Sequence, residues 1–214
     1  MFSITLTILI ITALISFAAF NNEKIKEDML FYPAEINSRN QYYRFLSYGL
    51  IHADFLHLAF NMLALWSFGQ YVEKYLFSNP NFFGEQGKLF YLILYITAII
   101  VSPLPDYFKH KNNFSYRALG ASGAVSAVIF AGIMLNPKIS ISLLFLPIPM
   151  PGYIFGVVFL VVSAILARKG GDNIGHGAHL TGAIYGLIFT IITTKVFADY
   201  DAVKVFLDLI LNRY

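Results

Sequence analysis

The sequence predicts an all-α polytopic membrane protein, a bundle of six transmembrane helices with a short, partly buried fourth helix. Of the 214 residues, 57% are hydrophobic and 13% are charged, whereas soluble domains have about 25% charged residues. The charged residues lie in short blocks between long apolar runs, which is typical of a chain that crosses a bilayer several times. No stretch is long and polar enough to form a second domain, so we expect one membrane domain over residues 1–214.

Each expected helix corresponds to an apolar run. About 20 helical residues, each adding ~1.5 Å, are needed to cross a hydrocarbon core ~30 Å thick. The fourth and fifth runs are shorter than this, which predicts helices that begin or end inside the membrane, against protein or a wet cavity. The first run lacks a basic leading segment and an Ala-x-Ala cleavage site, so we expect a retained helix. In chain order, the runs are residues 2–20, 49–71, 88–103, 119–136, 152–167 and 178–197.

The segments between the runs differ in character. Residues 21–48 form a long first loop, charged and then aromatic, which we expect to pack at the membrane interface. Pro103 and Pro105 are expected to end the third helix, and the proline-rich run Pro147–Pro151 to separate the fourth helix from the fifth. Residues 198–214 carry apolar side chains at helical spacing, which predicts an interfacial amphipathic tail on the membrane surface.

The charge distribution excludes some functions. The net charge is +3, but the cations are scattered over the loops, so no nucleic-acid partner is expected. Zero cysteines excludes disulfides, thiolate metal sites and a cysteine nucleophile. The first, third and fifth loops carry nine of the 15 Lys and Arg residues, a margin that leaves the membrane orientation open.

Polar side chains inside apolar runs are costly and are therefore candidates for function. They gather at the starts of the second, fourth and sixth runs. In an alternating bundle these three helices run in the same direction, so their starts lie in the same leaflet. The clusters are His52, Asp54, His57 and Asn61 in the second run, Ser122 and Ser126 in the fourth, and His176 and His179 in the sixth.

Small residues recur at every fourth position in the fourth and sixth runs. Such stripes let two membrane helices approach closely. Ser122 adjoins one stripe and His179 adjoins the other, so close packing would bring the hydroxyl and the imidazole together. The stripes are Gly123, Ala127 and Ala131 in the fourth run, and Ala178, Gly182 and Gly186 in the sixth.

These residue types suit acyl transfer. A serine hydroxyl is a weak nucleophile until a base takes its proton, and a neutral imidazole can do so near pH 7. No Asp or Glu lies in the fourth or sixth run, which predicts a dyad of Ser122 and His179. His57 and Asn61 share one helical face and, with the backbone N–H of Ser122, could stabilise an oxyanion. Their alternative role is polar contact between helices.

Three motifs resemble those of the rhomboid proteases. The run Gly120–Gly123 resembles their Gly-x-Ser-Gly motif, and residues 178–186 resemble Ala-His-x-x-Gly-x-x-x-Gly. His52, His57 and Asn61 are similar to the family's His-x(4)-His-x(3)-Asn run in the second span. The order and spacing of the motifs and the six-helix core all match the family, and the resemblance covers nearly the whole chain.

The resemblance implies a role for each of these residues. Ser122 would be the nucleophile, His179 the general base, and His57 and Asn61 the oxyanion stabilisers. The remaining motif residues, His52, Gly120, Gly123, Gly182 and Gly186, would support the site.

Other positions match the family's pattern less closely. Tyr43-Arg44 resembles a Trp-Arg motif, and Glu73 ends the second span as in the family. The resemblance implies that Arg44 and Glu73 anchor the first loop, with solvation of the loop as an equal alternative for each. Ser126 stands where the family often has a tyrosine that stacks on the catalytic histidine. A hydrogen bond or a ring from elsewhere must then hold His179.

The resemblance implies an intramembrane serine endopeptidase that cleaves transmembrane segments through an acyl-enzyme. Its partners would be transmembrane substrates and the lipid bilayer, with no cofactor, metal or nucleic acid. We expect an integral, multi-pass protein of a bacterial plasma membrane.

Three other functions are alternatives to a protease. The first is a catalytically inactive rhomboid-like binder of membrane clients. The second is a zinc enzyme whose metal ligands are His52, His57, His176 and His179. The sequence has no His-Glu-x-x-His motif and no membrane carboxylate to complete such a site. The third is a transporter, which would favour mid-membrane charges and internal repeats.

Overall fold

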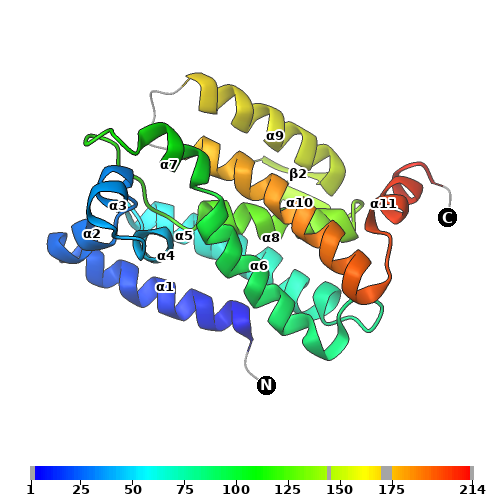
Figure 1. Ribbon diagram of the computed structural model, residues 1–214. Coiled ribbons are helices and arrows are strands. Elements are labelled where there is room, and N and C mark those ends of the chain that lie inside the picture. Colours follow the sequence, from blue (N-terminus) through cyan, green and yellow to red (C-terminus); the bar gives the residue numbers. More distant parts are fainter. Residues whose placement is uncertain (1–2, 144–145, 170–174, 213–214) are drawn as a thin grey trace.

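A computed structural model describes residues 3–143, 146–169 and 175–212. The described chain is mostly helical and forms a bundle (Figure 1). In that view α1 and α9 lie at opposite sides of the bundle, with α8 and α10 between them. The long apolar helices are α1 (Ile4–Phe20), α6 (Gly87–Val101), α8 (Ser122–Leu135), α9 (Gly152–Lys169) and α10 (His176–Ala198).

Helix α8 is the centre of the bundle. Every residue from Gly123 to Leu135 is buried, so none of this helix faces outward. It packs most extensively on α10, and also on α6. With 14 residues it is the short, buried fourth helix that the sequence predicts.

The second apolar run is divided by a sharp bend. The sequence predicted one helix from residue 49, but residues 51–54 are not helical and the two halves meet at 96°. The first half holds α4 (Arg44–Ser47) and η1 (Tyr48–Leu50). The second half begins at α5 (Phe55–Ala64), because the Asp54 carboxylate accepts a hydrogen bond from the His57 N–H and so caps the helix. It continues through two π-helical segments, η2 (Leu65–Gly69) and η3 (Val72–Phe77).

The number of spans can be judged from length and composition. Among the described residues, three helical stretches are long and apolar enough to cross a membrane: 84–110, 152–169 and 176–198. The bent second run can supply a fourth. Helices α1 and α8 are apolar but shorter, with 17 and 14 residues.

The long first loop is structured. It holds α2 (Glu23–Met29) and α3 (Pro33–Arg39). Between them, Phe31 forms an isolated antiparallel bridge with Ala118, with N–H···O distances of 2.9 and 3.0 Å. This bridge ties the loop to the extended segment that leads into α8.

The third helix ends just before Pro103, as predicted, and is followed by a short helix that the sequence did not predict. Helix α6 ends at Val101, but α7 (Leu104–His110) follows and includes Pro105 in its first turn. A proline is tolerated there because the backbone N–H of that turn has no helical partner. The short η4 (Gly84–Gln86) precedes α6.

The proline-rich connection after α8 is a hairpin that the sequence did not predict. Strand β1 (Ser140–Leu143) pairs antiparallel with β2 (Leu146–Pro151). The predicted tail helix is present as α11 (Ala202–Ile210), and exposed apolar side chains such as Val203 and Leu207 line it.

Candidate active site

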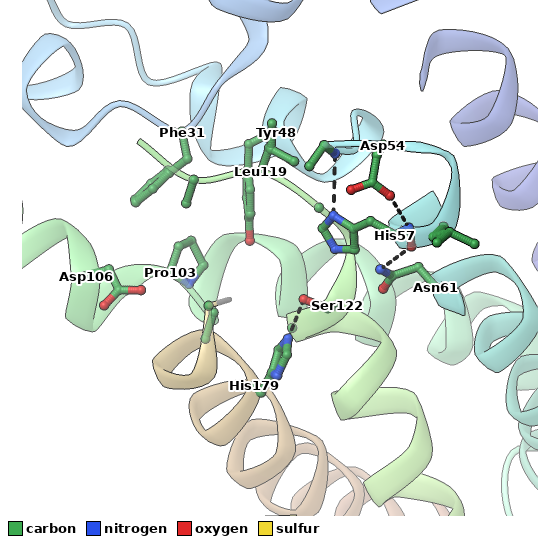
Figure 2. A pocket seen from close by; sticks show the side chains of 17 residues that line it. Phe31, Tyr48, Asp54, His57, Asn61, Pro103, Asp106, Leu119, Ser122 and His179 are labelled. Carbon is green, nitrogen blue, oxygen red and sulfur yellow. Dashed lines mark hydrogen bonds between the residues drawn. The ribbon is translucent and has the colours of Figure 1, made fainter. Parts of the chain in front are cut away.

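The structure brings Ser122 and His179 into contact. Ser122 is the first residue of α8, and His179 lies in the first turn of α10. The Nε2 atom of His179 is 2.6 Å from the Oγ atom of Ser122 (Figure 2). This is hydrogen-bonding distance, so the imidazole is placed to take the hydroxyl proton.

Glycines at the interface of α8 and α10 permit this contact. A Cβ atom added to Gly182 would overlap the backbone carbonyl of Gly123, and one added to Gly186 would overlap the backbone of Ala127. A Cβ atom on Gly123 would in turn overlap the Ser102 side chain. The two helices therefore pack backbone against backbone directly below the dyad.

His57 lies beside the dyad, with one edge of its ring turned toward Gly120. Its Nδ1 atom accepts a hydrogen bond from the Ala53 N–H at 3.4 Å. A neutral ring that accepts at Nδ1 carries its proton on Nε2. A Cβ atom on Gly120 would meet the Nε2 and Cε1 atoms of His57 at 3.0 and 2.7 Å, and Gly120 has a φ of +112°. Only glycine suits both conditions.

Asn61 supplies a second side-chain donor at this site, an amide group. It lies one turn after His57 on α5, and its Nδ2 atom donates to the His57 carbonyl at 3.0 Å. The amide group has a second N–H, which this bond does not use. His57, Asn61, Ser122 and His179 line the same cavity (Figure 2).

His52 supports His57 from the interior. It is fully buried in the non-helical break before α5. Its ring meets the His57 ring edge-on, with 5.0 Å between the ring centroids. The Ser16 hydroxyl donates to the Leu50 carbonyl at 2.9 Å and lies 3.0 Å from the His52 Nδ1 atom. Because its single proton is used, the Ser16 oxygen accepts from Nδ1–H. Ser16, on α1, carries no motif that the sequence could reveal.

Two neighbouring rings flank His179. Ser126 does not reach it, because the Ser126 hydroxyl donates to the Ser122 carbonyl at 2.9 Å. Instead, the Phe159 ring of α9 lies 6.3 Å from the imidazole at an interplanar angle of 32°. The His176 ring lies 5.8 Å away and edge-on. The sequence did not single out Phe159, since an aromatic residue in an apolar run resembles any other lipid-facing or core side chain.

The site opens into a cavity of about 570 Å³. Its lining includes two acidic residues, Asp54 and Asp106, of which the sequence singled out only the first. Asp106 comes from α7 and is half-buried. Burial, together with the negative charge of Asp106, raises the pKa of Tyr116.

The histidines do not form a metal site within the described ranges, where no group of three or more His, Cys, Asp and Glu residues could hold an ion. They divide instead into the pair His52 and His57 and the pair His176 and His179. The arrangement suits proton transfer and hydrogen bonding.

Arg44 crosslinks the first loop. Its buried guanidinium donates to the carbonyls of Glu27 and Leu30, each at 2.8 Å. It also donates to the Gln41 amide oxygen at 2.6 Å and to the Glu35 carboxylate at 3.0 Å. All of these groups belong to the loop that the sequence expected it to anchor.

Glu73 lies elsewhere, and the expectation that it anchors the first loop is wrong. Its carboxylate accepts hydrogen bonds from the N–H groups of Ile4 and Thr5, each at 2.8 Å, and from the Ser3 hydroxyl at 2.7 Å. It therefore caps the start of α1. A carboxylate is favourable there because the first N–H groups of a helix have no partner within the helix.

Comparison with known proteins identifies the family. Residues 39–196 match the sequence profile of the rhomboid domain. The chain is 26% identical to the rhomboid protease GlpG of Haemophilus influenzae over 168 residues, which cover 78% of each chain. It is 30% identical over 144 residues to the mitochondrial RHOMBOID-like protein 12 of Arabidopsis thaliana, covering 64% of this chain and 42% of the plant protein.

A human protein, the mitochondrial presenilin-associated rhomboid-like protein, is 28% identical over 142 residues, covering 64% of this chain. The chain thus spans less than half the length of the two mitochondrial relatives, 42% and 34%. The matched profile nevertheless extends over 158 of the 214 residues. Together with the mostly helical fold and its apolar spans, this match shows that the chain belongs to the rhomboid family of integral membrane proteins.

Proposed function

We propose that this protein is an intramembrane serine endopeptidase that hydrolyses peptide bonds in transmembrane segments. The observation that carries the proposal is the 2.6 Å contact between the His179 Nε2 and Ser122 Oγ atoms. A serine hydroxyl bonded to an imidazole, beside a cavity with further donors, is the arrangement that nucleophilic acyl transfer requires. The relative GlpG is named a protease.

The proposed reaction begins with attack by Ser122. Its Oγ atom attacks the carbonyl carbon of the substrate while His179 Nε2 takes the hydroxyl proton. Negative charge then develops on the carbonyl oxygen, and the donors available for it are His57 Nε2–H, the free N–H of Asn61 and the Ser122 backbone N–H. His179 passes its proton to the leaving amine, and an acyl-enzyme remains.

Hydrolysis of the acyl-enzyme repeats these steps with water. His179 takes a proton from the water, the hydroxide adds to the ester carbonyl, and Ser122 leaves with the proton returned by His179. No cofactor or metal takes part. The cavity of about 570 Å³ has room for a substrate segment and water.

In the proposed membrane arrangement the bundle has six spans: α1, the bent run ending at η3, α6 with α7, α8, α9 and α10. The whole chain would act as one rhomboid membrane domain, with residues 198–214 as its interfacial tail. We assign it to a bacterial plasma membrane. The exposed apolar side chains around α1 and α9 support a lipid-facing bundle.

A fluorophosphonate probe tests the nucleophile. The purified protein in detergent is incubated with the probe, with a single-span reporter substrate, or with the probe and then the substrate. We expect labelling at Ser122 that blocks cleavage, and loss of both in Ser122→Ala and His179→Ala. The matched control is Ser126→Ala, which removes a serine hydroxyl one turn further along α8 that only reaches a backbone carbonyl.

The results also separate the inactive alternative. A protein that binds the reporter but neither cleaves it nor takes the label would be a client binder rather than an enzyme. Cleavage that survives Ser122→Ala would refute the proposed mechanism.

A further inference from the structure

The active-site cavity has an uneven charge. Among the residues that the structure describes, 17 line it, and these include two carboxylates, Asp54 and Asp106, and no lysine or arginine. In Figure 2 the carboxylates lie on opposite sides of the dyad, Asp54 beside His57 and Asp106 beyond Pro103. A substrate that enters this cavity therefore meets two fixed acidic groups and no permanently charged basic one.

Only one of these carboxylates has a clear task in the free protein. Asp54 caps α5, because its Oδ1 atom accepts from the His57 N–H at 2.8 Å. Asp106 lies near Tyr116, and its negative charge contributes to raising the pKa of that hydroxyl. Within the described part of the chain, no lysine or arginine lies at ion-pair distance from Asp106.

Asp106 lies close to the start of a helix. It faces Gly177 in the first turn of α10, and a Cβ atom at Gly177 would lie 3.3 Å from the Asp106 Oδ1 atom. The start of a helix favours a negative charge. The same carboxylate group belongs to a residue that lines the active-site cavity.

We propose that Asp106 is a specificity-determining residue, which binds a lysine or arginine side chain of the substrate a few residues from the cleaved bond. This inference rests on the proposed protease function and names the substrate class of the same site. A half-buried carboxylate forms stronger ion pairs than one in water. Asp106 and Ser122 line the same cavity. Transmembrane segments commonly carry long basic side chains at one end.

The alternative role for Asp106 is structural. It could serve only to hold Tyr116 and the segment before Ser122. Tyr116→Phe separates the two roles, because it removes the Tyr116 hydroxyl and retains the Asp106 charge.

The test compares lysine with glutamine in one reporter substrate. Each residue from four before to four after the mapped cleavage site is replaced in turn by Lys or by Gln, and kcat/KM is measured for each pair. At one position we expect the Lys substrate to exceed the Gln substrate about 10-fold, as for one hydrogen bond between charged groups. Asp106→Asn should bring this ratio close to one, and Asp106→Lys should favour Glu over Gln at the same position.

Two control variants define the result. Tyr116→Phe should retain the lysine preference, and so should Asp28→Asn, which removes an exposed carboxylate outside the cavity. The proposal is overturned if no position prefers lysine, if Asp106→Asn keeps the preference, or if Tyr116→Phe abolishes it equally.

A binding measurement separates this inference from the proposed function. Fluorescent Lys and Gln substrates are titrated against Ser122→Ala protein, with and without Asp106→Asn. Tighter binding of the Lys substrate that depends on Asp106 supports the inference, whether or not the wild type cleaves the substrate. Absence of cleavage by the wild type refutes the protease function. Cleavage with no lysine preference in either measurement refutes the inference alone.

Discussion

Replacement of Gly182 by alanine should inactivate the protein without unfolding it. The added Cβ atom would overlap the backbone carbonyl of Gly123, the residue directly after Ser122. Backbone cannot move aside as a flexible side chain can, so α8 and α10 must separate, by roughly 1 Å to restore van der Waals contact. Overpacking of this kind costs about 1–3 kcal/mol of stability.

The expected effect on catalysis is larger than the effect on stability. A displacement of about 1 Å between the reacting groups can cost 100-fold in rate. The Ser122 and His179 side chains are 2.6 Å apart, so such a displacement would take them beyond hydrogen-bonding distance. We therefore expect Gly182→Ala to lower kcat about 100-fold and to slow fluorophosphonate labelling by a similar factor. Thermal unfolding in detergent should still show one cooperative transition.

The matched control is Gly156→Ala in α9. A Cβ atom there would meet the Phe130 ring at 3.4 Å, which is ordinary contact, so activity should stay near that of the wild type. Wild-type cleavage and labelling rates in Gly182→Ala would show that close packing of α8 and α10 does not position the dyad.

Three further variants test the surroundings of the dyad. Asn61→Ala should lower kcat by about 10–1000-fold, the range for loss of one oxyanion donor; an unchanged rate in a cleavage assay would remove Asn61 from that role. Gly120→Ala should lower kcat and disturb the His57 ring, because the position combines a positive φ with contact to that ring; normal turnover would contradict this. Arg44→Met should lower the free energy of unfolding by about 2 kcal/mol or more, since it removes hydrogen bonds from a buried charged group. An unchanged thermal transition would show that Arg44 contributes nothing to the fold.

The long helices could be predicted from sequence because their signal is local. An apolar run of the right length indicates a membrane helix wherever it packs, and α1, α9 and α10 lie within a few residues of the predicted ranges. The convergence of the second, fourth and sixth starts also followed from the alternating direction of spans. The alternating direction of the spans alone predicts that Ser122 and His179 lie at the same depth in the membrane.

Other features depend on tertiary contacts. The break at residues 51–54 was missed because His52 and Asp54 lie in a run that is apolar on average, and the cap that Asp54 forms is visible only in the folded chain. Asp106 follows a proline-rich turn and reads as a loop residue, although folding carries it to the cavity. Phe159 likewise meets His179 only through packing of α9 on α10.

The enclosure of α8 has a consequence for the membranes in which the protein can work. A helix of 14 residues is about 21 Å long, well short of the ~30 Å hydrocarbon thickness. A lipid-facing helix of this length would thin or deform the bilayer, at a cost that grows with hydrophobic mismatch. Because all of α8 beyond Ser122 is surrounded by protein, that cost does not arise, and changes in bilayer thickness act on the outer helices instead. Helix α8, which begins at Ser122, is thereby insulated from the lipid composition around the protein.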